Sequence, residues 1–313
     1  MLKNNQSAGR DKIVVIVGST ASGKTALSLE IAKWFNGEII SADSRQIYRG
    51  MNVGTAKPSE NELKQIRHYL IDIKNPNQDY SAGQYKKDAL AAIMKILKAG
   101  RLPIIVGGTG LYTDVIVKNL DMPEVKENKK LRARLEKDIE TKGLDFVFNK
   151  LIELDAEAAY IVDPRNPRRI IRAMEIALLT GRPFSAQRKS GPPLFDFLQI
   201  GLKLPPEILK EKIQKRTKIM IKNGLVDEVR GLVRKCGYTL KAFDAIGYRE
   251  IIDCLKNLIT PKEAEDLINK NTWHYARRQM TWFKRNSEIY WFDNNQKSAK
   301  AKIIKKVSKF LEF

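Results

Sequence analysis

The chain has 313 residues, of which 43% are hydrophobic and 30% charged, proportions typical of a soluble globular protein that exclude a disordered or fibrous chain. Its 57 lysines and arginines outnumber 36 acidic residues and leave a net charge of +21, which favours a polyanionic partner if the charge is clustered rather than spread over solvated faces. No apolar run reaches the length of about eighteen residues that a membrane helix needs, and the polar start Met1–Gln6 predicts no signal peptide, so the cytoplasm is the expected compartment.

The first predicted element is the buried strand Ile13–Val17, which leads into a glycine-rich turn and then a helix. The turn has the pattern G-x-x-x-x-G-K-[ST], in which backbone N–H groups and a helix N-terminus bind phosphates. Lys24 adds a positive charge, and the hydroxyl of Thr25 is the candidate ligand of Mg²⁺. The residues predicted to bind a polyphosphate are Gly18, Ser19, Thr20, Ala21, Ser22, Gly23, Lys24 and Thr25.

Strands and helices then alternate, which predicts a parallel sheet covered by helices. In such sheets ligands lie outside the carboxyl ends of the strands, so we expect the turn at residues 18–25, Asp43 and the turn Gly107–Tyr112 to meet at one edge. The further elements predicted in this half are a strand over Glu38–Asp43, a strand over Tyr69–Ile73, a helix over Tyr85–Ala99 and a strand over Leu102–Val106.

From about residue 121 to residue 193 the pattern changes to helices without strands. Asn166 and Pro167 are typical of a helix start, and Gly181 of its end. The spacing places an apolar face opposite a basic face, which is either an anion-binding surface or a solvated helix face. The apolar positions are Ile170, Ile171, Met174, Ala177 and Leu178, and the basic ones are Arg168, Arg169 and Arg172.

Two later runs, Phe195–Leu202 and Glu288–Phe292, are predicted strands. If both join the first sheet, the core domain is discontinuous, with residues 11–121 and 195–293, and residues 122–194 form a helical insertion. The remaining residues, 294–313, are predicted to be a peripheral, basic helical tail with a frayed end. Cys236 and Cys254 lie far apart, so reduced thiols are expected rather than a zinc site.

Positive charge is clustered in the C-terminal half. Residues 201–241 carry eleven lysines or arginines against four acidic residues. The segment Tyr275–Arg285 interleaves basic side chains, including Arg277 and Arg278, with aromatic rings that could stack on unpaired bases. The alternative for Trp282 and Phe283 is that both rings anchor the core.

Together these motifs resemble one family, the tRNA dimethylallyltransferases, also called tRNA isopentenyltransferases, in their bacterial form. The resemblance implies a P-loop NTPase-like parallel sheet core covered by helices, with an inserted all-helical domain that contacts tRNA. It covers residues 13 to 285, and it is carried by Gly18–Thr25, Ala42–Tyr48, Met51–Pro58, Gly107–Tyr112, Arg168–Glu175, Asp244–Tyr248 and Tyr275–Phe283.

The resemblance implies transfer of a dimethylallyl group from dimethylallyl diphosphate to N6 of the adenosine at position 37 of tRNA, with Mg²⁺ as cofactor. Asp43 would be the general base, Lys24 and Arg216 would stabilise the leaving diphosphate, and Thr109 would place a substrate. A monomer is the expected form. The residues matched to tRNA contacts, chiefly with the anticodon stem-loop, are Asp43, Ser44, Arg45, Gln46, Thr109, Arg132, Arg168, Arg169, Ile170, Ile171, Arg172, Arg277 and Arg278.

Three alternatives stay open from the sequence. An isopentenyltransferase acting on free adenylate would share the P-loop and Asp43, but would have little use for a basic helical insertion. A P-loop nucleotide kinase or ATPase would also use residues 18–25. A non-catalytic RNA-binding module would explain the basic and aromatic segments without needing Asp43.

Overall fold

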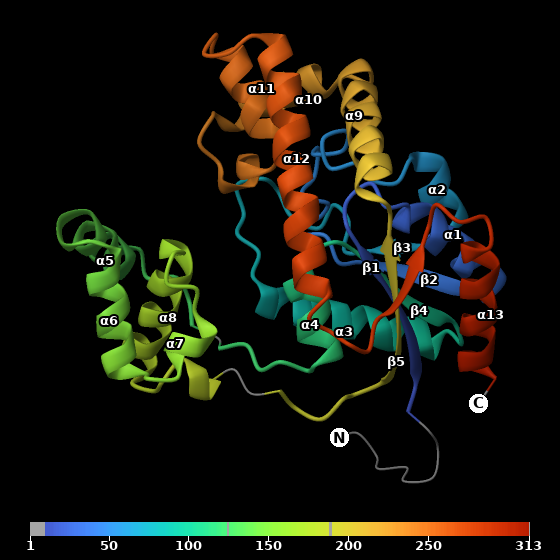
Figure 1. Cartoon of the computed structure of the whole chain (residues 1–313), viewed down its shortest axis with the longest axis horizontal. Coiled ribbons are helices and arrows are strands. Elements are labelled where there is room, and N and C mark those ends of the chain that lie inside the picture. The colour runs from blue at the N-terminus through green and yellow to red at the C-terminus, as the bar shows by residue number, and fades with distance from the viewer. Residues whose placement is uncertain (1–9, 124, 188–189, 313) are drawn as a thin grey trace. The chain divides into compact units, whose positions relative to one another are not determined.

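A six-stranded sheet forms the centre of the computed structural model, which describes residues 10–123, 125–187 and 190–312 (Figure 1). Every neighbouring pair of its strands is parallel, and the order is β3-β2-β4-β1-β5-β6. The expected parallel sheet is confirmed. The strands are β1 (Lys12–Gly18), β2 (Gly37–Ser41), β3 (His68–Tyr69), β4 (Leu102–Val106), β5 (Asp196–Lys203) and β6 (Tyr290–Asp293).

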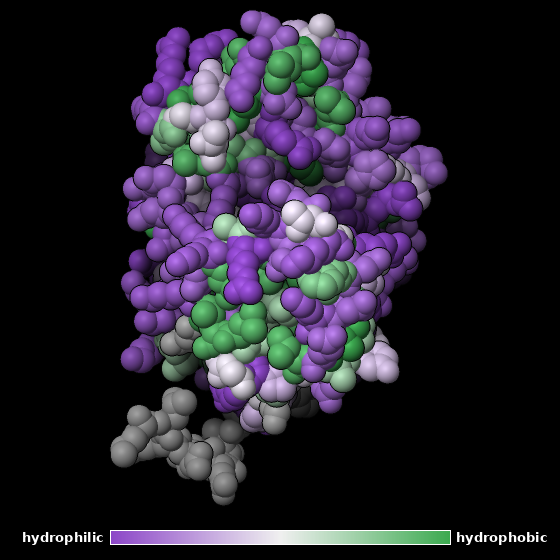
Figure 2. Space-filling model, turned by 90° about the vertical axis from the view of Figure 1, so that its left-hand side faces the viewer, coloured by the Kyte–Doolittle hydropathy of each residue, from purple (hydrophilic) through white to green (hydrophobic). Residues whose placement is uncertain are grey.

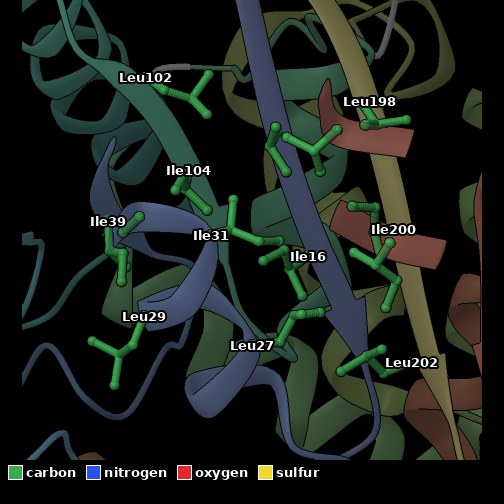
Figure 3. Packing of buried hydrophobic residues seen from close by; sticks show 14 residues of the cluster. Ile16, Leu27, Leu29, Ile31, Ile39, Leu102, Ile104, Leu198, Ile200 and Leu202 are labelled. Carbon is green, nitrogen blue, oxygen red and sulfur yellow. The ribbon is translucent and has the colours of Figure 1, made fainter. Parts of the chain in front are cut away.

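Helices cover both faces of this sheet. On one face, side chains of α1 (Lys24–Trp34) pack between those of β1, β2, β4 and β5, as Figure 3 shows for Leu27, Ile31 and Ile16. On the other face, β2 and β4 contact α3 (Ala82–Lys98), and β1 contacts α12 (Pro261–Phe283). Helix α4 (Gly110–Val117) packs against α3 and α12. The sheet is therefore buried on both sides, which explains why β1 reads as an unbroken apolar run.

The C-terminal segment forms a helix, as predicted, but this helix packs onto the sheet, so the prediction that it is peripheral is wrong. Helix α13 (Ala299–Leu311) contacts β5 and β6. Ile303 and Val307 of this helix are fully buried in the same cluster as α1. Their spacing of four residues puts both on one face, and the lysines between them remain at the surface.

The predicted strand Tyr69–Ile73 is much shorter in the structure, where β3 ends at Tyr69. Leu70 and Asp72 have left-handed backbone conformations, with φ values of 63° and 56°, which a strand does not accommodate. The Asp72 carboxylate there accepts a hydrogen bond from the ammonium group of Lys57 at 2.5 Å. A tertiary contact thus replaces the regular strand that the apolar pattern favours.

A second core lies beyond the carboxyl edge of the sheet. It joins the chain after β2, at Ile47 and Met51, to the helices that follow β5, through Val229, Tyr248 and Ile268. This cluster brings the segment Met51–Pro58 against helices that lie far away in the sequence. The helices of this region are α9 (Pro206–Lys222), α10 (Leu225–Cys236), the short helix η2 (Lys241–Asp244), α11 (Tyr248–Leu255) and the first half of α12. The short helix α2 (Glu60–Gln65), which has no buried residue, follows the segment Met51–Pro58.

Residues 118–193 form a compact unit of their own, and residues 1–117 and 194–313 form the other. The smaller unit has its own apolar core, which includes Leu135, Leu151 and Ile170. Its last long helix begins after Asn166, whose side chain accepts the backbone N–H of Arg169, and ends at Gly181, as predicted. The elements of the unit are α5 (Lys129–Lys142), α6 (Leu144–Leu154), α7 (Ala158–Ile161), α8 (Pro167–Thr180) and the short helix η1 (Ser185–Gln187).

Hydrophilic residues cover much of the face seen in Figure 2, with hydrophobic residues in small groups between them. Within the described ranges, none of the helices combines the length and the apolar character needed to span a bilayer.

Candidate active site

The glycine-rich turn after β1 presents the N-terminus of α1 to a cavity of about 950 Å³. Gly23 lies before the helix with a left-handed φ of 94°, and no side chain caps the first turn. Gly23, Lys24 and Thr25 all line the cavity. The first N–H groups of α1, which have no partner within the helix, are therefore positioned to bind an anion in this cavity.

Lys24 bridges the turn in this structure. Its ammonium group donates hydrogen bonds to the carbonyl oxygens of Gly18, at 3.0 Å, and Ser19, at 2.7 Å. Burial and the positive charge of Arg216 lower the pKa of Lys24 to about 7, although the negative charge of Asp43 acts in the opposite direction. The ionisable side chains of Lys24, Asp43 and Arg216 therefore lie close enough to influence one another, although they are far apart in the sequence.

This pKa predicts how diphosphate affinity depends on pH. A bound anion stabilises the protonated form of Lys24. Above about pH 7, where Lys24 of the free protein has lost its proton, binding of diphosphate must therefore be accompanied by uptake of a proton at Lys24. We expect diphosphate affinity, measured in EDTA by calorimetry between about pH 6 and pH 9, to fall by up to about tenfold per pH unit above that point. In Lys24→Met the affinity can change with pH only through the titration of diphosphate itself, so its decrease above about pH 7 should be shallower than in the wild type. An equal decrease of affinity with pH in both proteins would contradict a pKa of about 7 for Lys24.

Asp43 follows β2 at the carboxyl edge of the sheet, as expected. One carboxylate oxygen, Oδ1, accepts the backbone N–H groups of Arg45 at 2.8 Å and Gln46 at 3.4 Å. The other oxygen, Oδ2, has no hydrogen bond within the described part of the chain. The side chain is therefore oriented by the backbone that follows it, and one oxygen is left to accept a proton.

The turn after β4 reaches the same place because β4 lies between β1 and β2. Thr109 Oγ1 accepts the backbone N–H of Ser44 at 3.0 Å and donates to the Ser44 hydroxyl at 3.4 Å. Thr109 also hydrogen-bonds Tyr275 of α12, whose pKa burial raises to about 12. Thr109 thus links the segment that carries Asp43 to α12.

Two cavities meet at Asp43. The larger one contains the N-terminus of α1, and a second one, of about 310 Å³, is lined by Ser44, Arg45 and Arg278. The residues that line both cavities are Thr20, Asp43, Thr55, Arg216, Met220 and Tyr275. Asp43 therefore lies between the cavity at the N-terminus of α1 and a second cavity lined by three arginines, Arg45, Arg216 and Arg278.

Arg216 lies on α9 at this junction. Burial lowers the pKa of its guanidinium group, and the charge of Asp43 opposes that effect. The guanidinium group of Arg216 makes no hydrogen bond or ion pair among the residues that the structure describes. Its donors are therefore available to an anion in the cavity.

Gln279 is a site residue that the sequence analysis quoted within a motif without giving it a role. Its amide oxygen accepts the backbone N–H of Thr20 at 2.8 Å, and its amide nitrogen donates to the carbonyl of Gly108 at 2.9 Å. A Cβ atom at Gly108 would lie 2.1 Å from that nitrogen, so any larger residue there would displace the Gln279 amide. Gln279 thus ties the turn after β1 to the turn after β4.

The segment Tyr275–Arg285 divides between core and surface. Phe283 is buried, and Trp282 lies so close to Gly110 that a Cβ atom there would be 2.2 Å from its ring. The alternative of a core anchor therefore holds for Phe283, whereas Trp282 is half-buried and packs against the turn at Gly110. Arg277 and Arg278 are exposed, and only Arg278 lines one of the two cavities.

Two of the predicted tRNA contacts of the helical unit, Arg132 and Arg172, bind the carboxylate of Glu175, a residue to which the sequence analysis assigned no role. Glu175 is 0% exposed. Its carboxylate accepts the backbone N–H of Asn128 at 2.7 Å, two bonds from Arg132 at 3.0 and 2.7 Å, and one from Arg172. Burial acts to raise the pKa of Glu175, but these bonds outweigh it and the pKa is lowered.

Ile170 and Ile171, both matched to tRNA contacts, are buried in the core of the helical unit, so their side chains pack inside the unit and do not face an RNA. They fall on the apolar face of α8, which must pack against α5 and α6. Leu178, also predicted on that face, is exposed. Arg168 and Arg169 lie at the surface of the helical unit.

Replacing Glu175 is expected to destabilise this unit. Glu175→Ala leaves two arginines partly buried without their carboxylate, which costs about 3–5 kcal/mol of unfolding free energy. We expect earlier urea unfolding and faster proteolysis between residues 118 and 193. Glu153→Ala, at an exposed position of α6, provides the control. If Glu175→Ala and Glu153→Ala unfold at the same urea concentration, the prediction is contradicted.

A model of the IPP transferase family matches residues 46–286 of this chain. A tRNA dimethylallyltransferase from Acetivibrio thermocellus is 42% identical over 306 residues, which cover 96% of this chain and 97% of the relative. One from Caldanaerobacter subterraneus subsp. tengcongensis is 45% identical over 288 residues, covering 90% and 91%.

Solved structures agree with these relatives. The full-length tRNA isopentenylpyrophosphate transferase from Bacillus halodurans superposes with a TM-score of 0.73 at 36% identity, covering 97% of each chain. A eukaryotic dimethylallyltransferase acting on tRNA superposes with a TM-score of 0.80 at 25% identity, covering 96% of this chain and 80% of that one.

Proposed function

The chain belongs to the IPP transferase family and is a prenyltransferase, and from this premise we propose that it prenylates tRNA at N6 of the adenosine at position 37. The donor is dimethylallyl diphosphate, and diphosphate is the product released. One observation carries the proposal, which is that Asp43 faces both the anion-binding cavity and the second cavity.

The reaction follows from this placement. The N6 atom of adenine attacks C1 of the dimethylallyl group while the bond from C1 to the diphosphate oxygen breaks. The amine loses a proton as the new C–N bond forms, and Oδ2 of Asp43 accepts it. The hydrogen bonds from the backbone of Arg45 and Gln46 hold the carboxylate in place for that transfer.

Negative charge grows on the leaving diphosphate. The N–H groups at the start of α1, the ammonium group of Lys24 and the guanidinium group of Arg216 surround the larger cavity and would stabilise that charge. Residues 18–25 would therefore hold a departing diphosphate, with no phosphoryl group transferred.

The donor set also fits Mg²⁺. The hydroxyl of Thr25 lies in the first turn of α1 at the cavity, and oxygen ligands of this kind suit a hard cation that keeps most of its ligands from water and phosphate. When bound there with the diphosphate, Mg²⁺ would supply additional charge neutralisation.

The acceptor base must leave its stack to reach Asp43. We place it where the two cavities meet at Asp43. Gln46 of the larger cavity and Ser44, Arg45 and Arg278 of the second one offer polar contacts there. The exposed Arg168 and Arg169 of the helical unit would bind the phosphates of the anticodon stem-loop. The enzyme acts as a monomer in the cytoplasm under this proposal.

The test incubates the purified protein with labelled dimethylallyl diphosphate, Mg²⁺ and either unmodified tRNA or AMP. We expect tRNA to be labelled far better than AMP, and mass spectrometry of the tRNA nucleosides to detect N6-isopentenyladenosine. Equal or better transfer to AMP would instead identify a free-adenylate transferase. ATP turnover that dimethylallyl diphosphate does not inhibit would identify a kinase or ATPase.

A further inference from the structure

The segment Met51–Pro58 forms a wall of both cavities. Residues 52, 53 and 55–58 line the larger cavity, and residues 54 and 55 line the smaller one. This segment contains no regular helix or strand. Two turn bonds link its own backbone, from the Ala56 N–H to the Val53 carbonyl at 3.0 Å and from the Lys57 N–H to the Asn52 carbonyl at 3.1 Å, so its attachment to the rest of the chain depends on contacts from other elements. The contacts that fix the position of this segment therefore affect the shape of both cavities.

A single carboxylate on α10 binds the backbone of this wall. Glu228 Oε2 accepts the N–H groups of Asn52 and Val53, both at 2.8 Å, and Oε1 accepts the N–H of Gly54 at 3.1 Å. The hydroxyl of Tyr248 donates to the same Oε1 at 2.6 Å. Two carboxylate oxygens thus satisfy three consecutive backbone donors and one hydroxyl.

Tyr248 also contacts the wall directly. It is fully buried, and a Cβ atom at Gly54 would lie 2.5 to 2.8 Å from its ring. The ring therefore packs on the backbone at Gly54, and the carboxylate of Glu228 lies beside that contact. Helices α10 and α11 each supply one of these two side chains.

The other end of the wall holds Gln46. The Gln46 amide nitrogen donates to the carbonyl oxygens of Thr55 at 3.4 Å and Ala56 at 3.3 Å, and its amide oxygen accepts the hydroxyl of Ser41 at 3.1 Å. The backbone N–H of Gln46 in turn binds Asp43. Displacement of the wall would therefore move the Gln46 amide, which lines the larger cavity beside Asp43.

We propose that Glu228 is a positioning residue that holds the wall Met51–Pro58 so that the amide of Gln46 is presented to the acceptor adenosine. The inference rests on the proposed function, because it assigns Gln46 to nucleobase recognition. A carboxylate is required since four donors converge on two oxygens, whereas a glutamine has one oxygen and would direct an N–H₂ group at backbone N–H donors.

The test compares Glu228→Gln with Asp227→Asn, a matched change in the same turn of α10 at a side chain that is 78% exposed. Steady-state kinetics with tRNA and dimethylallyl diphosphate give kcat and both KM values. For Glu228→Gln we expect kcat/KM for tRNA to fall about tenfold to a hundredfold, the effect of losing hydrogen bonds to a charged group, while KM for dimethylallyl diphosphate stays within about twofold.

A double-mutant cycle with Gln46→Ala separates positioning from general support of the fold. If Glu228 acts through Gln46, Glu228→Gln adds almost no further loss of kcat/KM in the Gln46→Ala background. Additive losses, or a lowered melting temperature with unchanged kinetics, would overturn the inference. Tyr248→Phe removes one donor and should show the same selective loss more weakly, which provides the test if Glu228→Gln does not fold.

The activity of the wild type shows whether a negative result refutes the role of Glu228 or the proposed function itself. Transfer to tRNA by the wild type, with Glu228→Gln indistinguishable from Asp227→Asn, refutes the role of Glu228 alone. Absence of transfer to tRNA by the wild type refutes the proposed function, and the inference with it.

Discussion

Asp43→Asn is expected to lower the single-turnover rate of transfer to tRNA by about a hundredfold to ten-thousandfold, the range associated with loss of a general base. Asparagine keeps an oxygen that can accept the backbone N–H groups of Arg45 and Gln46, so the local structure should persist. It cannot accept the proton from the attacking amine. The loss should therefore appear in the chemical step.

Binding and a matched control make this result specific. The affinity of Asp43→Asn for tRNA, measured by filter binding, should stay within a few-fold of the wild type because the phosphate contacts lie elsewhere. Asp79→Asn changes a side chain that is 77% exposed and lines neither cavity, and should leave the rate unaltered. A wild-type rate for Asp43→Asn would exclude the base and favour a non-catalytic RNA-binding module.

Arg216→Ala is expected to lower kcat about a hundredfold to a thousandfold, the effect of removing one preorganised donor from developing negative charge. The guanidinium group lies at the junction of the cavities and has no bond within the described part of the chain, so little fold stability depends on it. Arg216→Lys keeps a charge but loses the fork of donors, and should recover only part of the rate.

The same experiment should separate chemistry from general charge. Diphosphate, as a competitive inhibitor, should bind Arg216→Ala more weakly, and the melting temperature should change little. Lys210→Ala removes an exposed positive charge from the same helix, away from both cavities, and serves as the control. If Arg216→Ala and Lys210→Ala lose activity equally, the effect comes from the overall positive charge of α9, and the specific role of Arg216 is refuted.

Much of the site follows from local patterns. The strand, turn and helix around residues 12–34 can be read from one apolar run and two glycines because each contact joins residues close in sequence. The bounds of α8 follow from Asn166, Pro167 and Gly181 for the same reason. The meeting of the first turn with Asp43 needs only the rule that parallel strands present their carboxyl ends at one edge.

Other expectations failed where long-range packing overrides a local pattern. β3 ends at Tyr69, earlier than predicted, because the chain leaves the extended conformation at Leu70 and Asp72, and the Asp72 side chain contacts Lys57. Ile170 and Ile171 belong to a motif matched to tRNA contacts, yet motif membership does not say which side chains face outward. The tail at residues 294–313 reads as basic, but Ile303 and Val307 make it part of the core.

The strand, turn and helix at residues 12–34, the parallel sheet and the place of Asp43 at its edge can be predicted from the sequence, because they depend on residues close together in the chain or on strand order. The residues that hold these parts in place are visible only in the folded chain. Gln279 lies 259 residues from Thr20, and Glu228 lies 176 residues from Asn52. No spacing rule links such pairs, since they meet only when α12 and α10 pack against the segments that line the cavities.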